Sequence, residues 1–196
     1  NKNKKISFTS YNDLYQYSIN NPINFWALYW KFSKIIYHKS FTNVVDDIHK
    51  LPGAKWFQGS QLNYAENLLK YRDNQTALIY IDEKNVHKTI TYNELFNFVN
   101  QLASYLRKIG IKKNDRVVGF LPNIPEAIIA MLATTSIGAI WSSCSPDFGV
   151  NGVLDRFKQI KPKLLFCSDS YQYNGKQIDC LEKVKLIVKN LPSLDK

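Results

Sequence analysis

The hydrophobic pattern changes its period along the chain, and each period predicts a different kind of element. Residues 10–13 form a helix-capping signal before an aromatic helical segment, and the Asn-Pro pair at 21–22 starts a second helix. Apolar side chains on nearly every face of these helices predict burial against a larger body. A Pro/Gly turn then precedes Trp56 and Phe57, which we expect to be exposed, and a short helix is expected at about residues 63–70.

The middle of the chain alternates with period two and predicts a β-hairpin, with strands at 76–81 and 86–91 and a turn at 82–85. Thr91 and Glu94 have the spacing of a capping box. The apolar stripe that follows recurs with helical spacing and stops at Gly110. We therefore predict a long amphipathic helix directly after the hairpin.

From residue 115 onward, apolar strands alternate with helices. We predict strands at 116–121, 139–144 and 163–168, and helices at 124–137, 148–160 and 177–190. This alternation predicts right-handed crossovers and a parallel sheet covered on both faces. The predicted fold is therefore α/β: N-terminal helices and a β-hairpin, followed by an incomplete doubly wound parallel sheet with the order β-α-β-α-β-α. Because such sheets usually contain five or more strands, we expect these residues to be the first part of a longer protein.

Residues 127–146 contain no Asp, Glu, Lys or Arg, and this run is long enough to cross a membrane. Its many hydroxyl side chains and Gly138 instead predict a buried helix, a turn and a buried strand. Asn123 and Glu126 have the spacing of an N-cap and its partner, with Pro125 in the first turn. We therefore predict no membrane span.

Composition narrows the class of protein. The chain is 45% hydrophobic and 21% charged, as globular proteins are, and no secretory signal opens it, so we predict a cytoplasmic protein. The net charge of +10 would suit binding of a nucleotide or another polyanion. The lysines are spread along the chain among Asn, Ile and Tyr residues, a mixture that AT-rich codons supply, so coding bias explains the charge. We therefore predict no nucleic-acid partner.

The cysteines and histidines indicate neither a disulfide framework nor a metal site. Cys144, Cys167 and Cys180 are odd in number and form no Cys-x-x-Cys pair, so we expect free thiols, two of them buried in strands. The three histidines have no Cys or carboxylate at ligand spacing. We therefore predict that no residue of this sequence is a metal ligand.

Candidate chemistry lies in the loops after the predicted strands, at 122–125, 145–149 and 168–176, because open parallel sheets bind ligands beyond the carboxyl ends of their strands. The second loop offers hydroxyl and carboxylate groups near a helix N-terminus. In the third, Tyr171, Tyr173 and Lys176 could set aromatic rings and an ammonium around a nucleotide, although ordinary turn chemistry explains the same residues. No Walker A loop, GxGxxG motif or Ser-His-Asp arrangement is found, and we predict no catalytic residue in this segment.

Three stretches carry a resemblance to a known family. "WFQGSQLNYAENLL" resembles the entry segment of short-chain acyl-CoA synthetases, and "SYNDLYQYSINNPINFWALYW" is similar to their N-terminal helices. The region from "GFLPNIPEAIIAMLATTSIGAIWSSCSPDFG" to "YQYNGK" resembles the acetoacetyl-CoA synthetases, the acetoacetate-activating branch of the adenylate-forming superfamily. Acetate- and propionate-activating relatives usually have Phe-Gly-Gly where this chain has Ser145, Pro146 and Asp147. The resemblance covers about residues 10–196.

The resemblance implies the N-terminal portion of a two-step ligase. ATP and acetoacetate would give acetoacetyl-adenylate and pyrophosphate with Mg²⁺, and the CoA thiol would then displace AMP. Residues 1–72 would be the helical N-terminal extension and residues 73–196 the first part of the AMP-binding domain. The Ser/Thr/Gly-rich phosphate loop and the late catalytic Lys of the family are not in this segment, which is therefore expected to be inactive alone.

The resemblance also implies contacts with the nucleotide end of CoA. The loop of Ser145, Pro146 and Asp147 matches one that touches CoA in acetate-activating relatives, and Tyr173 and Lys176 match two arginines that reach its phosphates. Lys176 keeps the positive charge without the bidentate fork, and Tyr173 loses the charge. Two alternatives stay open: a ligase for another short acid, such as acetate or propionate, and a non-catalytic basic binding module.

Overall fold

The computed structural model of the chain describes residues 6–195. It divides into two compact units, an N-terminal unit (Asn1–Leu62) and a sheet unit (Asn63–Lys196). The predicted domain boundary after residue 72 lies inside the second of these units. Each unit has its own helices and strands.

The N-terminal unit contains two helices, α1 (Tyr11–Asn20) and α2 (Pro22–Phe32), and two short antiparallel strands, β1 (Asn43–Val45) and β2 (Trp56–Gln58). The predicted cap is confirmed, because the Ser10 side chain accepts a hydrogen bond from the Asp13 amide. The predicted burial of the two helices is wrong within this unit, since neither contains a buried residue. Their aromatic rings instead pack on one another, on β2 and on a loop residue, Phe41; the ring centroids of Trp30 and Phe57 on β2 lie 4.7 Å apart.

The β1–β2 pair was not predicted, and it changes the expected exposure of the aromatic residues within it. Trp56 is 41% exposed, as expected. Phe57 is partly buried, because its ring packs against Trp30 and Phe41. A three-residue strand is too short to produce a clear alternating pattern, which explains why the pairing was missed.

The sheet unit begins with the short helix α3 (Tyr64–Leu68) and the predicted hairpin, β3 (Thr76–Ile81) and β4 (His87–Thr91). Helix α4 (Tyr92–Lys108) follows directly. Its predicted capping box is confirmed: Thr91 accepts from the Glu94 amide at 3.2 Å, and the Glu94 carboxylate accepts from the Thr91 amide at 2.8 Å. The change from period two to helical period therefore locates this junction correctly.

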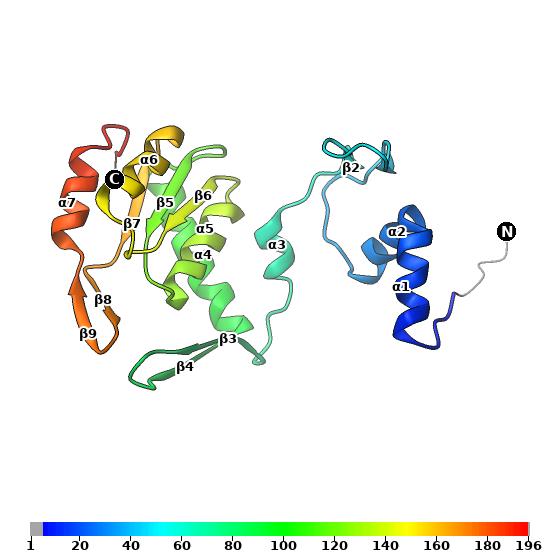
Figure 1. Cartoon of the computed structure of the whole chain (residues 1–196), viewed down its shortest axis with the longest axis horizontal. Coiled ribbons are helices and arrows are strands. Elements are labelled where there is room, and N and C mark those ends of the chain that lie inside the picture. The colour runs from blue at the N-terminus through cyan, green and yellow to red at the C-terminus, as the bar shows by residue number, and fades with distance from the viewer. Residues whose placement is uncertain (1–5, 196) are drawn as a thin grey trace. The chain divides into compact units, whose positions relative to one another are not determined.

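Three parallel strands form the centre of the sheet unit (Figure 1). They are β5 (Arg116–Phe120), β6 (Ile140–Cys144) and β7 (Leu164–Cys167), in the spatial order β6-β5-β7. Helices α5 (Pro125–Ser136), α6 (Val150–Ile160) and α7 (Leu181–Lys189) follow the three strands in turn. The predicted α/β class and its parallel sheet are confirmed.

The two faces of β5 contribute to two hydrophobic cores, because successive side chains of a strand point to opposite faces. Val117 packs in the core that contains α4 and α5 residues, whereas Val118 and Phe120 pack in the core of α6 and α7. All three side chains are fully buried. Gly119 lies between them, where a Cβ atom would come within 2.7 Å of the Trp141 ring, so only glycine allows this close approach.

Two details of the uncharged run differ from the prediction. Ile124, not Asn123, is the N-cap of α5, and no side chain caps this helix. The Glu126 carboxylate lies 3.1 Å from the ammonium of Lys88 on β4, so it pairs across the fold and does not complete a capping box. The following strand, β6, is only partly buried, and Ile140 is 48% exposed, because β6 lies at one edge of the three-stranded sheet.

The largest difference lies after β7. A loop and then a helix from residue 177 were predicted, but residues Ser170–Tyr173 (β8) and Lys176–Asp179 (β9) form an antiparallel hairpin, and α7 begins only at Leu181. Asn174 and Gly175 make its turn with φ values of 50° and 71°. A two-residue type I′ turn requires positive φ at both positions, and Asn-Gly is the sequence that favours it. This dipeptide is the signal that was overlooked.

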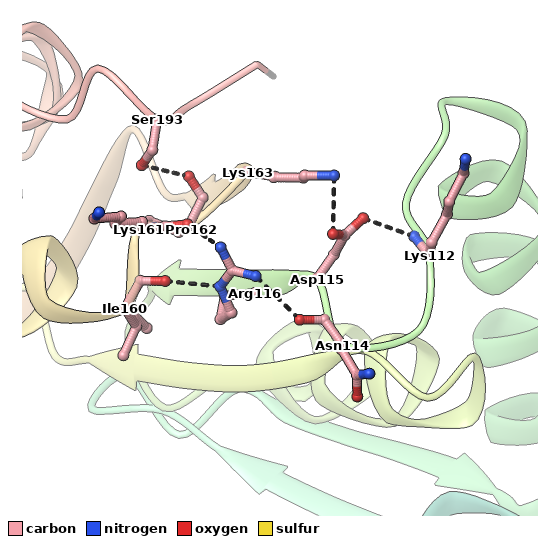
Figure 2. Close-up of polar contacts among 9 residues, drawn as sticks. All are labelled: Lys112, Asn114, Asp115, Arg116, Ile160, Lys161, Pro162, Lys163 and Ser193. Atoms are coloured by element: carbon pink, nitrogen blue, oxygen red, sulfur yellow. Dashed lines mark hydrogen bonds and ion pairs between the residues drawn. The ribbon is translucent and has the colours of Figure 1, made fainter.

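The amino end of the sheet is closed by polar contacts, as Figure 2 shows. The Asp115 carboxylate accepts from the Lys112 amide at 2.9 Å and from the Lys163 ammonium at 2.8 Å. Burial raises the pKa of Asp115, but these hydrogen bonds outweigh burial and hold the pKa below its ordinary value. The start of β5 is thereby tied to the start of β7.

Arg116 completes this closure through backbone carbonyls. Its guanidinium donates to the carbonyl oxygens of Ile160 at 2.7 Å and Lys161 at 3.0 Å, which lie at the end of α6, and to that of Asn114 at 3.2 Å (Figure 2). The last carbonyls of a helix have no partner inside the helix, and a cation there is favourable. Arg116 is therefore a structural residue.

Among residues 6–195, no helix is both long and apolar enough to span a membrane.

Candidate functional site

The carboxyl ends of the three parallel strands bring the predicted candidate loops to one edge of the sheet. In the loop after β6, Ser145 is partly buried, Pro146 is fully buried and Asp147 is exposed. The Ser145 hydroxyl donates to the Asp147 carboxylate at 2.7 Å. Pro146 is therefore inaccessible to a ligand, whereas Asp147 is open to solvent.

Two side chains from other elements hold this loop. The Tyr171 hydroxyl on β8 donates to the Asp147 carboxylate at 2.8 Å, and the Lys183 ammonium on α7 donates to the Pro146 carbonyl at 3.0 Å. Hydrogen bonds from Ser145 and then Tyr171 lower the pKa of Asp147. Partial burial, followed by the bond to Asp147, raises the pKa of Tyr171 to about 12. The loop after β6 and the hairpin after β7 thus form one hydrogen-bonded unit.

The remaining candidates lie at the tip of the β8–β9 hairpin. Tyr173 and Lys176 are cross-strand partners on either side of the Asn-Gly turn, so their side chains project from the same face. Tyr171, two residues before Tyr173, shares that face. Tyr173 is 59% exposed and Lys176 is also exposed. The hairpin therefore displays a tyrosine ring and an ammonium on the face from which Tyr171 reaches Asp147.

A carboxylate from a distant part of the sequence holds the hairpin tip. Glu83, in the turn between β3 and β4, accepts from the amides of Asn174 at 2.9 Å and Gly175 at 3.0 Å. Asp82 shapes that turn by accepting from the Lys84 and Val86 amides, each at 2.8 Å. No sequence signal connects residues 91 positions apart, so the role of Glu83 could not be found from the sequence.

A pocket of about 430 Å³ lies between the β3–β4 turn, the loop after β5 and strand β8. Its lining includes Glu83, Asn123, Ser168, Tyr171 and Gln172. A second pocket of about 300 Å³ is more apolar and lies beside Leu102, Ile129 and Phe166. Both pockets open at the carboxyl end of the sheet, where ligands of open α/β folds bind.

Comparison with known proteins decides the family. Residues 65–196 match the family described as AMP-binding enzyme, and residues 11–68 match the family described as acetyl-coenzyme A synthetase N-terminus. The chain belongs to the AMP-binding enzymes. The two matched regions cover nearly all of the chain, in agreement with the resemblance inferred from its motifs.

Relatives within the AMP-binding family are more specific. The chain is 48% identical to acetoacetyl-CoA synthetase of Mus musculus over 97% of its length, and 49% identical to that of Danio rerio over its whole length. A solved structure of acetoacetyl-CoA synthetase from Streptomyces lividans matches 96% of the chain with a TM-score of 0.88 and 39% identity. The chain spans about 30% of the length of these relatives.

The other candidate groups of this AMP-binding chain do not assemble into a reactive site. Among the described residues, no three His, Cys, Asp or Glu side chains are grouped so as to hold a metal ion. Cys144 and Cys180 are buried, and burial raises the pKa of both thiols, which disfavours the nucleophilic thiolate. Of the two cysteines predicted to be buried in strands, only Cys144 fits: Cys167 ends β7 but is exposed, and Cys180 precedes α7.

Proposed function

We propose that this chain is the N-terminal portion of an ATP-dependent acetoacetate–CoA ligase. In the first step, the acetoacetate carboxylate attacks the α-phosphate of ATP, giving acetoacetyl-adenylate and releasing pyrophosphate. In the second, the CoA thiol attacks the acyl carbonyl, losing its proton and expelling AMP. The observation that carries the proposal is the identity of 48% to acetoacetyl-CoA synthetase of Mus musculus over nearly the entire chain.

The catalytic groups for adenylation belong, in this proposal, to parts of the enzyme outside these residues. The carboxyl end of the sheet offers hydrogen-bond donors, acceptors and a cation, but the described residues offer no set of metal ligands for the Mg²⁺ that accompanies ATP. The contribution of this chain is therefore scaffold and binding surface. A cytoplasmic location remains a prediction.

We further propose that the carboxyl end of the sheet contacts the nucleotide end of CoA. The exposed ammonium of Lys176 can pair with a phosphate, and the exposed ring of Tyr173 beside it can pack against the adenine base. Ser145 and Asp147 would border the same site through their side chains and backbone. Pro146 is buried and its carbonyl already accepts from Lys183, so it supports the loop and leaves little surface for CoA.

The acid substrate is tested with the complete enzyme and a panel of acetoacetate, acetate and propionate. The expected result is that kcat/KM for acid-dependent ATP–pyrophosphate exchange is highest with acetoacetate. A higher value for acetate or propionate would show that the chain belongs to a ligase for another short acid. This assay reports the preference for the acid alone, because ATP–pyrophosphate exchange measures adenylate formation before CoA takes part.

A further inference from the structure

The hydrogen bond between Tyr171 and Asp147 links the two loops proposed to contact CoA. Tyr171 belongs to β8, which leads to Tyr173 and Lys176, whereas Asp147 belongs to the loop after β6. The two residues are 24 positions apart in the sequence. The 2.8 Å bond therefore sets the position of one loop relative to the other.

Tyr171 is itself firmly held. Its ring packs against the core of α6 and α7, which contains the fully buried Val118, Phe120 and Phe157. A tyrosine whose ring is packed and whose hydroxyl is bonded loses little further freedom when a ligand binds nearby. The Tyr171 side chain thus connects the core to the surface loop and has little freedom to move.

The bond also directs the charge of Asp147. This carboxylate is exposed and lies on a surface where the proposed ligand carries phosphates. Ser145 donates to one of its oxygens and Tyr171 to the other, at 2.7 and 2.8 Å. Removing the Tyr171 hydroxyl frees one oxygen of a carboxylate that repels an anionic ligand, and also frees the loop to move.

Lys183, on a different element, supports the same loop. Its ammonium donates to the Pro146 carbonyl at 3.0 Å, and Pro146 itself is fully buried. The loop is thereby bonded both to β8 and to α7. Removing either bond should loosen the loop without disturbing the sheet, because neither side chain belongs to β5, β6 or β7.

We propose that Tyr171 and Lys183 are positioning residues for CoA: they hold the Ser145–Pro146–Asp147 loop in a fixed place relative to Lys176. Neither residue has to touch CoA for this role. The inference rests on the proposed function, because it concerns the CoA half-reaction of the same ligase. It adds Lys183, which the sequence pattern did not assign to the site, and it gives Tyr171 a positioning role through Asp147.

The test is Tyr171→Phe in the complete enzyme, with both half-reactions measured separately. The expected result is a rise of about three- to tenfold in KM for CoA, the range given by one hydrogen bond of ordinary strength, with acetoacetate-dependent ATP–pyrophosphate exchange changed less than twofold. Tyr105→Phe, at an exposed tyrosine on α4, is the matched control and should change neither. Lys183→Met provides a second, independent variant, and it should also raise KM for CoA.

A double-mutant cycle identifies the partner through which Tyr171 acts. In an Asp147→Ala background, Tyr171→Phe should produce little further change in KM for CoA, because its bonding partner is already gone. Unchanged KM in both the Tyr171 and the Lys183 variants overturns the inference, as does an equal loss in both half-reactions. A wild-type enzyme without acetoacetate-dependent exchange would instead refute the proposed function, and the two failures are therefore distinguishable.

Discussion

At the amino end of the sheet, Asp115 and Arg116 are bonded to groups of neighbouring elements, whereas at the carboxyl end Asp147 and Lys176 face solvent. Asp115 is 8% exposed and pairs with Lys163, and Arg116 donates to three backbone carbonyls. Asp147 accepts from two hydroxyl groups but remains exposed. An acidic and a basic side chain thus close the amino end of the sheet, whereas an acidic and a basic side chain at the carboxyl end stay accessible to solvent.

This difference shows how a structural polar cluster is distinguished from a candidate site. In sequence, both clusters are charged residues in turns beside apolar strands. In the structure, the donors at the amino end are directed at backbone groups that would otherwise lack partners. The hydroxyl groups and the ammonium at the carboxyl end lie around pockets and an exposed hairpin. We therefore expect mutations at the two ends to affect different properties.

The largest expected effect is on stability at the amino end. Asp115→Ala should lower the free energy of unfolding by about 2–3 kcal/mol, because it leaves the Lys163 ammonium and the Lys112 amide without their partner. Urea unfolding of the chain, followed by circular dichroism, measures this change. Asp155→Ala on the exposed side of α6 is the control and should cost less than about 0.5 kcal/mol. Equal, small losses in both variants would contradict a structural role for Asp115.

Acid should weaken the amino end. The folded pKa of Asp115 lies below its unfolded value, so its contribution to stability is complete above the unfolded pKa of about 3.9 and is lost as pH falls through the folded pKa. Unfolding free energy measured from pH 5 to pH 2 should therefore fall less steeply in Asp115→Asn than in the wild type. Parallel curves for the two proteins would argue against a depressed pKa.

Alkali should weaken the carboxyl end. The folded pKa of Tyr171 is raised to about 12, above the ordinary value of about 10, so the stabilisation is fully present below pH 10 and is lost as pH rises toward 12. Ionised Tyr171 can no longer donate to Asp147. Ultraviolet titration of tyrosinate should show a late-titrating component that is missing in Tyr171→Phe. Identical titration curves would contradict this assignment.

The smallest expected effect is local, at the hairpin tip. Glu83→Ala removes the acceptor for the Asn174 and Gly175 amides, and the loss of these exposed hydrogen bonds should cost about 1 kcal/mol or less. Hydrogen exchange should show faster exchange of these two amides, with no change at the buried strand β5. Glu182→Ala, which removes an exposed ion pair on α7, is the control and should leave the hairpin tip unchanged.

The hydrophobic pattern predicted an element correctly where the spacing of apolar residues within that element alone identifies it as a helix or a strand. The hairpin of β3 and β4, helix α4 and the three parallel strands all follow from apolar spacing and capping residues such as Thr91 and Glu94. The β8–β9 hairpin was not predicted, because its strands alternate weakly and Asn-Gly is also common in loops. Glu126 was misassigned because a tertiary partner, Lys88, competed with the local cap.

The candidate site was only partly predictable for a related reason. The sequence indicates that Ser145, Asp147, Tyr173 and Lys176 follow parallel strands, and a parallel sheet places such residues at one edge. It does not indicate which side chains bond to one another. The contacts of Tyr171 with Asp147 and of Glu83 with the hairpin depend on packing between distant segments.

The most direct test of the account is Lys176→Ala in the complete enzyme. We predict that KM for CoA rises about tenfold or more, as expected for the loss of a charge-assisted hydrogen bond, while acetoacetate-dependent ATP–pyrophosphate exchange stays within twofold of the wild type. Lys176→Arg, which keeps the charge, should retain most of the affinity, and Lys108→Ala on α4 should leave both reactions unchanged. An unaltered KM for CoA in Lys176→Ala, or equal losses in both half-reactions, would contradict a CoA-binding role for the carboxyl end of this sheet.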